Sequence, residues 1–118
     1  MSRGLGQLQR RILAELEHVE SASILTLARN VHDDATAANR ESIRRALHSL
    51  IARRLVAKMP GYRSRERVYY TDGTKTWHTQ FTLRRIAETE ARRQYEAFCK
   101  QYGPWKGTVD EWMDLSVG

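Results

Sequence analysis

Hydrogen-bonding side chains gather in one short stretch near the middle of this chain. In that stretch Ile43, Leu47 and Leu50 recur at helical spacing, which predicts a helix with one apolar stripe. Arg44 and Arg45 fall on the opposite side of the same helix. An arginine can hold the edge of a guanine base through two hydrogen bonds, and it can also bind a phosphate. These side chains therefore suit nucleic acid, and a solvated pair of arginines is the alternative.

The segment after this helix is also basic. The sequence predicts a strand over residues 55–59, a break at Pro60 and a second strand over residues 67–70. From Thr36 to Arg67 there are nine Lys or Arg and two Glu, whereas the whole chain is only +6. The positive charge therefore belongs to the helix and the expected hairpin. Such a pair suits double-stranded DNA, because a helix can enter the major groove while a hairpin reaches the flanking backbone.

Two sets of side chains are candidates for these contacts. Ser42 and Arg45 are our first choices for base edges, since serine can donate or accept a hydrogen bond and arginine can make a pair. The other polar side chains on this helix face can read bases or bind phosphate. The cations of the hairpin suit the DNA backbone or the minor groove. The alternative for the hairpin is a solvated loop without DNA contacts. The base-reading candidates are Asn39, Ser42, Arg44, Arg45 and His48; the backbone and wing candidates are Arg40, Lys58, Arg63, Arg65 and Arg67.

Further helices are expected before this stretch. Apolar residues at helical spacing predict a first helix over residues 5–19. A very short strand is expected at residues 24–25, after which Thr26 would cap a second helix over residues 27–32. Asn39 is the expected cap of the basic helix, because its short side chain can accept a bond from a free amide of the first turn.

Three helices followed by a two-stranded hairpin, with the third helix the most basic, resemble the winged helix-turn-helix domain. The resemblance covers residues 5–75, and small bacterial regulators of the MarR and PadR type share the pattern. Two features differ from it: Arg54 stands where such proteins often have glycine, and the linker before the third helix is long. The resemblance rests on Leu27-Ala28-Arg29, Ser42-Ile43-Arg44-Arg45-Ala46-Leu47 with Leu50, Leu55-Val56, and Val68-Tyr69-Tyr70-Thr71-Asp72-Gly73.

The resemblance implies a mostly α fold with a small β-hairpin, consisting of a winged helix-turn-helix domain and a long C-terminal helix. We expect residues 1–73 to be the DNA-binding domain and residues 74–118 to be a helical dimerisation segment with a tail. The helix is predicted over residues 76–102, although the alternation over residues 77–83 would also suit a strand. Good helix formers over residues 84–100 favour the helix.

An aromatic face on this long helix is expected to make a homodimer, because monomers seldom show a large apolar patch to water. The alternative is a monomer in which the tail covers the face through Trp105 and Trp112. In the tail, Thr108 and Glu111 fit a capping box, which predicts one or two helical turns over residues 109–115. The expected interface residues are Trp77, Phe81, Tyr95, Phe98 and Tyr102.

Nothing in the sequence indicates catalysis. The four histidines share no metal-ligand spacing, and there is no glycine-rich phosphate loop, nucleophile elbow or carboxylate pair. We therefore expect no enzyme activity, no metal and no cofactor. Tyr69, Tyr70, Trp77 and Phe81 are expected in the core rather than in a ligand site. A groove between the long helix and the N-terminal domain could hold a small effector, but the sequence names none.

The composition agrees with a cytoplasmic protein that binds a polyanion. A chain of 118 residues is the size of one domain, and 41% apolar and 29% charged residues are ordinary for a soluble protein. No apolar run could span a bilayer, no signal peptide is visible, and Cys99 is alone. The leading hypothesis is a homodimeric transcriptional regulator, a repressor rather than an activator. The alternatives are a winged-helix adaptor that binds protein instead of DNA, and a DNA-binding replication, partition or mobile-element accessory protein.

Overall fold

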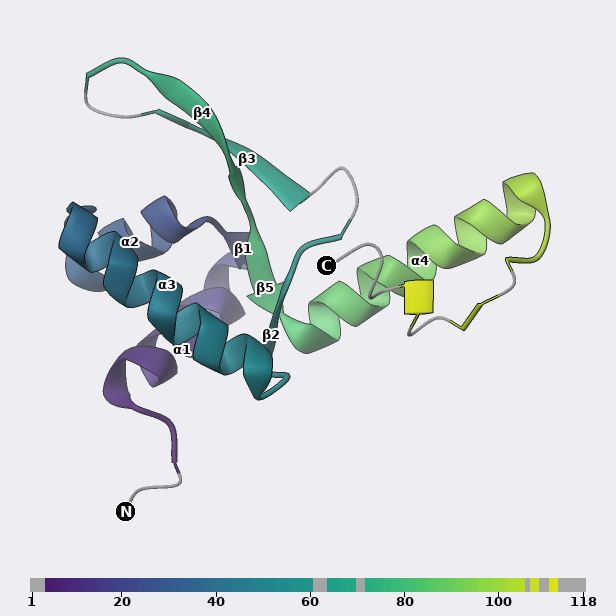
Figure 1. Ribbon diagram of the computed structural model, residues 1–118, viewed down its shortest axis with the longest axis horizontal. Helices are drawn as coiled ribbons and strands as arrows, with labels where there is room; N and C mark the ends of the chain where they lie inside the picture. The colour runs from purple at the N-terminus through teal and green to yellow at the C-terminus, as the bar shows by residue number, and fades with distance from the viewer. Residues whose placement is uncertain (1–3, 61–63, 70–71, 106, 109–110, 113–118) are drawn as a thin grey trace.

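The computed structural model describes residues 4–60, 64–69, 72–105, 107–108 and 111–112. Within these ranges the chain is a mixed α/β structure of four helices and two small antiparallel sheets (Figure 1). None of the helices described is long and apolar enough to cross a membrane. The elements in chain order are α1 (Gln7–Val19), β1 (Ser21–Ala22), α2 (Ile24–His32), α3 (Ala37–Ala52), β2 (Val56–Lys58), β3 (Arg65–Tyr69), β4 (Lys75–Thr79), β5 (Phe81–Leu83) and α4 (Arg84–Tyr102).

Hydroxyl side chains begin two of the helices. Ser23 precedes α2 and its oxygen accepts a hydrogen bond from the amide of Thr26 at 3.2 Å. Thr36 precedes α3 and accepts from the amide of Asn39 at 3.1 Å. The predicted caps were therefore wrong, because Thr26 and Asn39 are the third residues of their helices and donate these bonds. The strand expected at residue 24 was also wrong, since Ile24 is already in α2.

The apolar stripes of the first three helices meet in one core. Ile12 and Leu16 of α1 are buried, as are Ile43, Leu47 and Leu50 of α3, which confirms the two predicted stripes at these positions, whereas Val19 at the end of the first stripe is exposed. Phe81 and Leu83 of β5 close the same core from the sheet side. The remaining buried members are Ala22, Leu27, Ala28, Val31, Ala46 and Val56.

Strand β5 lies at the centre of the three-stranded sheet, whose order is β1-β5-β2. Thr82 pairs with Ser21 on one side and with Ala57 on the other. The predicted helix over residues 76–83 was therefore wrong. The alternative of a strand, which the alternation over residues 77–83 also suited, is correct. Extended backbone is required here because it gives both neighbouring strands a hydrogen-bonding partner.

The hairpin is formed by β3 and β4, which pair with each other and project beyond the three-stranded sheet (Figure 1). The predicted pairing of residues 55–59 with residues 67–70 was therefore wrong, since β2 pairs with β5 instead. β3 and β4 lie between β2 and β5 in the chain, so the hairpin is an insertion between two paired strands of the three-stranded sheet. The proposed division after residue 73 falls between β3 and β4.

Helix α3 ends at Ala52, and the chain has left-handed backbone two residues later. Arg54 has φ 60°, and the amide of Leu55 donates to the carbonyl of Leu50 at 3.0 Å while the amide of Arg54 donates to that of Ile51 at 2.9 Å. These bonds form the Schellman arrangement, in which the left-handed position usually holds glycine. Arg54 stands where the resembling proteins often have glycine, and it adopts the conformation that glycine would adopt more easily.

Helix α4 begins directly after β5 and extends away from the three-helix core (Figure 1). Trp105 and Trp112 of the tail contact Tyr95 of α4, with ring centroids 6.3 and 6.1 Å away. Trp112 also lies 5.2 Å from the ring of Phe98. The tail thus covers this part of α4 within one chain, as the monomeric alternative requires.

The five-residue dimer face predicted for one long helix does not exist in that form. Trp77 lies in β4 and Phe81 is buried in β5, because the chain is extended there. Of the five residues, Tyr102 is the one on α4 that stays well exposed, at 70%. In the tail, the amide of Glu111 donates to the hydroxyl of Thr108 at 3.1 Å, as the predicted cap requires. Residues 109–110 and 113–115 of the predicted turn lie outside the described residues.

Candidate nucleic-acid interface

The outward face of α3 carries the predicted polar residues, but it does not expose them equally. The side chain of Arg45 is 78% exposed and that of Arg44 is 47% exposed. His48 is exposed one turn further along the helix, whereas Ser42 is half-buried. Ser42 and Arg45 lie toward the start of α1, where they line a hollow of about 610 Å³. Arg44 and His48 lie on the side that faces the hairpin.

One carboxylate holds both arginines of this face. Glu41 accepts a hydrogen bond from Nε of Arg44 at 2.8 Å and a second from its Nη2, and it accepts one from Nε of Arg45 at 3.2 Å. The bonds from Arg44 are the main reason that the pKa of Glu41 falls from 4.5 to about 2, and Arg45 adds to the effect. The same contact raises the pKa of the Arg44 guanidinium. The outward face of α3 therefore keeps a net positive charge, but the carboxylate of Glu41 neutralises one of the two arginine charges.

Two other candidate residues on α3 are less available for contact with nucleic acid than the sequence suggested. The side-chain amide of Asn39 donates to the carbonyl of Asp34 at 2.9 Å, so it holds the linker before α3. Arg40 is half-buried on the same turn, near the edge of the apolar stripe. Neither side chain points as freely to solvent as Arg45 does.

The outer face of the β3–β4 hairpin is a second basic surface. Side chains two positions apart in a strand share a face, and cross-strand partners lie side by side on it. The register pairs Arg67 with Trp77 and Tyr69 with Lys75. Two of the predicted backbone contacts, Arg65 and Arg67, lie on this face, while Arg63 lies outside the described residues. The exposed members of this outer face are Arg65, Arg67, Tyr69, Lys75, Trp77 and Thr79.

The inner face of the hairpin attaches it to α2. Glu66 accepts a hydrogen bond from the hydroxyl of Thr26 and another from the side-chain amide of Gln80, both at 3.0 Å. Val68 is buried on this face, and Arg29 donates to the backbone carbonyl of Tyr69 at 3.3 Å. The acidic residue of β3 therefore points away from the outer face.

A groove of about 380 Å³ separates α3 from β4. Arg44 and His48 line it from α3, Lys58 lines it from the exposed end of β2, and Trp77 lines it from the hairpin. The two basic surfaces thus border one groove. The sequence did not lead us to place Tyr69, Lys75 or Trp77 on this surface, since Trp77 was assigned to the dimer face. The period-2 alternation through residues 75–79 could have placed Lys75 and Trp77 on one face of a strand.

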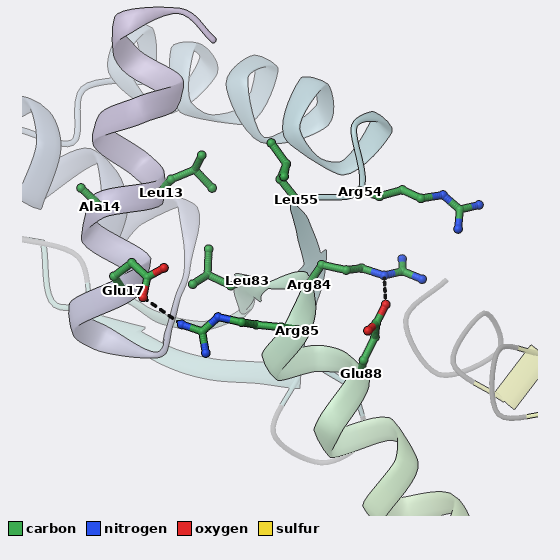
Figure 2. A pocket seen from close by; sticks show the side chains of 9 residues that line it. All are labelled: Leu13, Ala14, Glu17, Arg54, Leu55, Leu83, Arg84, Arg85 and Glu88. Atoms are coloured by element: carbon green, nitrogen blue, oxygen red, sulfur yellow. Dashed lines mark hydrogen bonds and ion pairs between the residues drawn. The ribbon is translucent and has the colours of Figure 1, made fainter. Parts of the chain in front are cut away.

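A second hollow, of about 570 Å³, lies between α1 and the start of α4 (Figure 2). Leu13, Leu55 and Leu83 give it an apolar lining. At its rim Arg85 lies 2.8 Å from Glu17, an ion pair that links α4 to α1. This hollow lies between the long helix and the N-terminal helices, where a groove was expected from the sequence. In the part of the chain that is described, no three His, Cys, Asp or Glu side chains are grouped to hold a metal ion.

No protein family and no curated protein sequence matches this chain. The assignment of a function therefore depends on the arrangement of α3, the hairpin and the groove between them.

Proposed function

We propose that this chain is a winged helix-turn-helix protein that binds double-stranded DNA in a sequence-specific manner. Strand β1 lies between α1 and α2, three helices precede β2 and β5 of the same sheet, and a hairpin extends between β2 and β5. In this proposal α3 is the recognition helix and the β3–β4 hairpin is the wing. The arrangement supports the proposal because α3, which exposes Arg44 and Arg45, stands beside the basic β3–β4 hairpin.

The observation that carries the proposal is that both basic surfaces border the same groove. Arg44 and His48 on one side and Lys58 and Trp77 on the other are close enough to line one hollow. A duplex whose major groove held α3 would therefore pass its backbone over the hairpin. In this pose Arg45 reads a base edge, and the hairpin cations hold phosphates of the flanking backbone.

We propose a transcriptional regulator as the cellular role, since a protein seated in the major groove blocks other proteins from the same site. A repressor needs nothing beyond this occupancy, whereas an activator needs a further contact. A replication or partition accessory protein would bind DNA with the same surfaces, and the position of its sites would separate the two roles.

Salt-dependent binding to duplex DNA tests the proposal. A protein with about six phosphate contacts should lose about a thousandfold in affinity between about 50 and 200 mM salt. Fluorescence anisotropy with a labelled duplex of random sequence measures this, and selection from a random pool then identifies the preferred site. Absence of binding to any duplex at low salt would refute the proposal and favour the protein-binding adaptor.

Homodimer formation is a separate proposal. A two-fold dimer would set two α3 helices against successive major grooves, about 34 Å apart. Tyr95 and Phe98 contact the tail, so the end of α4 with exposed Tyr102 is the surface that remains for a partner. Sedimentation at micromolar concentration checks this: a mass twice 13.7 kDa that Tyr102→Glu halves would support the dimer. A 13.7 kDa species alone would refute it and leave the tail as the cover of α4.

A further inference from the structure

Two large aromatic side chains are exposed on the outer face of the hairpin. Trp77 is 58% exposed and Tyr69 is 55% exposed, although their sequence context predicted that both would be core residues. Phe81, two residues beyond the end of β4, is buried as predicted. Burial of an aromatic ring is among the most favourable of all side-chain burials. Two exposed rings on one small face therefore indicate a binding surface.

Cations alternate with these rings across the same face. The guanidinium carbon of Arg67 lies 5.2 Å from the ring centre of Trp77, and Nζ of Lys75 lies 5.9 Å from that of Tyr69. Arg65 adds a third cation. Glu66 is turned to the inner face, where it binds Thr26 and Gln80. Among the described residues, therefore, the outer face has three cations and no carboxylate.

This combination suits unpaired nucleotides better than a duplex. Every base has a π-face that can stack on an aromatic ring, and such stacking tolerates any sequence. In a duplex the base faces are already stacked on each other, so only the edges and the backbone are accessible to a side chain. Cations beside the rings can hold the phosphates that join successive stacked bases.

We propose that the outer face of the β3–β4 hairpin binds single-stranded DNA, with Trp77 and Tyr69 stacking on unpaired bases and Arg65, Arg67 and Lys75 holding the phosphates. Trp77 also lines the groove beside α3. A single strand on the hairpin would therefore begin where a duplex on α3 ends. This activity goes beyond duplex binding and uses the aromatic side chains that duplex binding leaves unexplained.

Two labelled oligonucleotides of about 12 nucleotides test the proposal on the unaltered protein, a length within the usual range for single-strand sites. One carries thymine at every position, and the other has the same sugar-phosphate chain without bases. Both carry the same charge, so a difference in affinity reports the bases alone. Anisotropy should show at least about fivefold tighter binding to the thymine strand. Equal affinity for the two strands would overturn the proposal.

Substitutions at Trp77 assign the stacking. Trp77→Ala should remove most of the preference for the thymine strand, and Trp77→Phe should keep part of it, because phenylalanine still offers a ring. Leu55→Ala is the matched control, since it removes an exposed apolar side chain from the hollow between α1 and α4, away from the hairpin. It should leave the preference unchanged. A full preference in Trp77→Ala, with melting that shows a folded protein, would overturn the assignment.

A third variant separates this proposal from the duplex proposal. Arg45→Ala removes a cation from α3, away from the hairpin face, so it should weaken duplex binding and leave the thymine strand bound. If the protein binds no duplex but prefers the thymine strand through Trp77, the duplex proposal fails and the present one stands. If it binds duplex and shows no preference between the two single strands, the present proposal fails alone.

Discussion

The two basic regions, α3 and the β3–β4 hairpin, each contain one glutamate among their arginines but place it differently. In α3, Glu41 lies on the outward face and binds both Arg44 and Arg45. In the hairpin, Glu66 lies on the inner face, where Thr26 donates to it. The outward face of the helix is therefore partly neutralised by its own carboxylate, whereas among the described residues the outer face of the hairpin has cations alone.

The period of each secondary structure causes this difference. Side chains three and four positions apart share a helix face, so Glu41 meets Arg44 and Arg45. Adjacent side chains of a strand point to opposite faces, so Glu66 points away from Arg65 and Arg67. Two segments of similar composition thus present different charges to a partner. Local net charge, read from a sequence, does not tell which of two basic segments attracts phosphate more strongly.

The largest effect is expected when the hairpin cations are removed. Arg65→Ala with Arg67→Ala takes two cations from the outer face. Because a hydrogen bond to a charged group contributes about 1.5–3 kcal/mol, losing two should weaken duplex binding about a hundredfold or more. The slope of log affinity against log salt should also become shallower by about two units. Anisotropy titrations with a random duplex at several salt concentrations measure both quantities.

The matched control changes Arg92 and Lys100 to alanine. Both are exposed on α4, so this variant loses the same net charge from a different surface. Its affinity should fall much less, and its salt slope should stay close to that of the unaltered protein. An equal loss of affinity in the control would contradict the special role of the hairpin. Binding would then depend on the net charge of the protein and not on the cations of the hairpin face.

Arg45→Ala should have the next largest effect, and the effect should depend on sequence. Losing a paired contact to a guanine should cost about 1–3 kcal/mol on the preferred site and less on random duplex. Arg45→Lys keeps the charge without the paired geometry, so it should restore random binding more than preferred binding. An equal loss of affinity for the two duplexes would show that Arg45 binds phosphate. The helix and the hairpin would then differ only in how strongly each binds the DNA backbone.

Glu66→Ala should affect stability rather than DNA affinity. The two hydrogen bonds from Thr26 and Gln80 attach the hairpin to α2 and to the end of β4. Removing their acceptor should lower the free energy of unfolding by about 2 kcal/mol, since the donors are partly buried. Denaturant unfolding gives this value, and Glu66→Gln, which keeps an acceptor, should lose less. A large gain in DNA affinity without a loss of stability would mean that Glu66 faces the ligand.

The sequence predicted the regions whose pattern is local and long. The stripe of α1 and that of α3 each run through several helical turns, so their buried faces and the exposed positions of Arg44 and Arg45 followed from the period alone. Helix starts were displaced, because several hydroxyl or amide side chains near each start could cap, and packing decides among them.

The strand pairing could not be derived in the same way. β5 lies more than twenty residues after β2, and its partners are chosen by the core that Phe81 and Leu83 enter. An alternation of five to seven residues also suits both a strand and the start of a helix. The error moved Trp77 from an expected helix to the hairpin, and with it the expected dimer face was lost. The long-range pairing thus decided which residues belong to the candidate site.

Glu41→Gln has the smallest expected effect, and it tests the neutralising role of Glu41 on α3. The depressed pKa means that the carboxylate and its ion pairs are present above the ordinary value of 4.5 and are lost only as the pH falls through about 2. The substitution should therefore raise affinity for random duplex by about two- to fivefold, as expected for removing one exposed charge near a phosphate. The gain should be the same at neutral and mildly acidic pH.

The measurement is the same anisotropy titration, repeated at low and high salt, where the gain should shrink as the charge is screened. A carboxyl titration by NMR checks the cause, because Arg44→Ala should move the pKa of Glu41 from about 2 back toward 4.5. If Glu41→Gln leaves affinity unchanged while the hairpin variant weakens it, α3 does not approach phosphates in the complex. The hairpin would then be the main phosphate-binding surface, and base reading by α3 would depend on the result for Arg45→Ala on the preferred site.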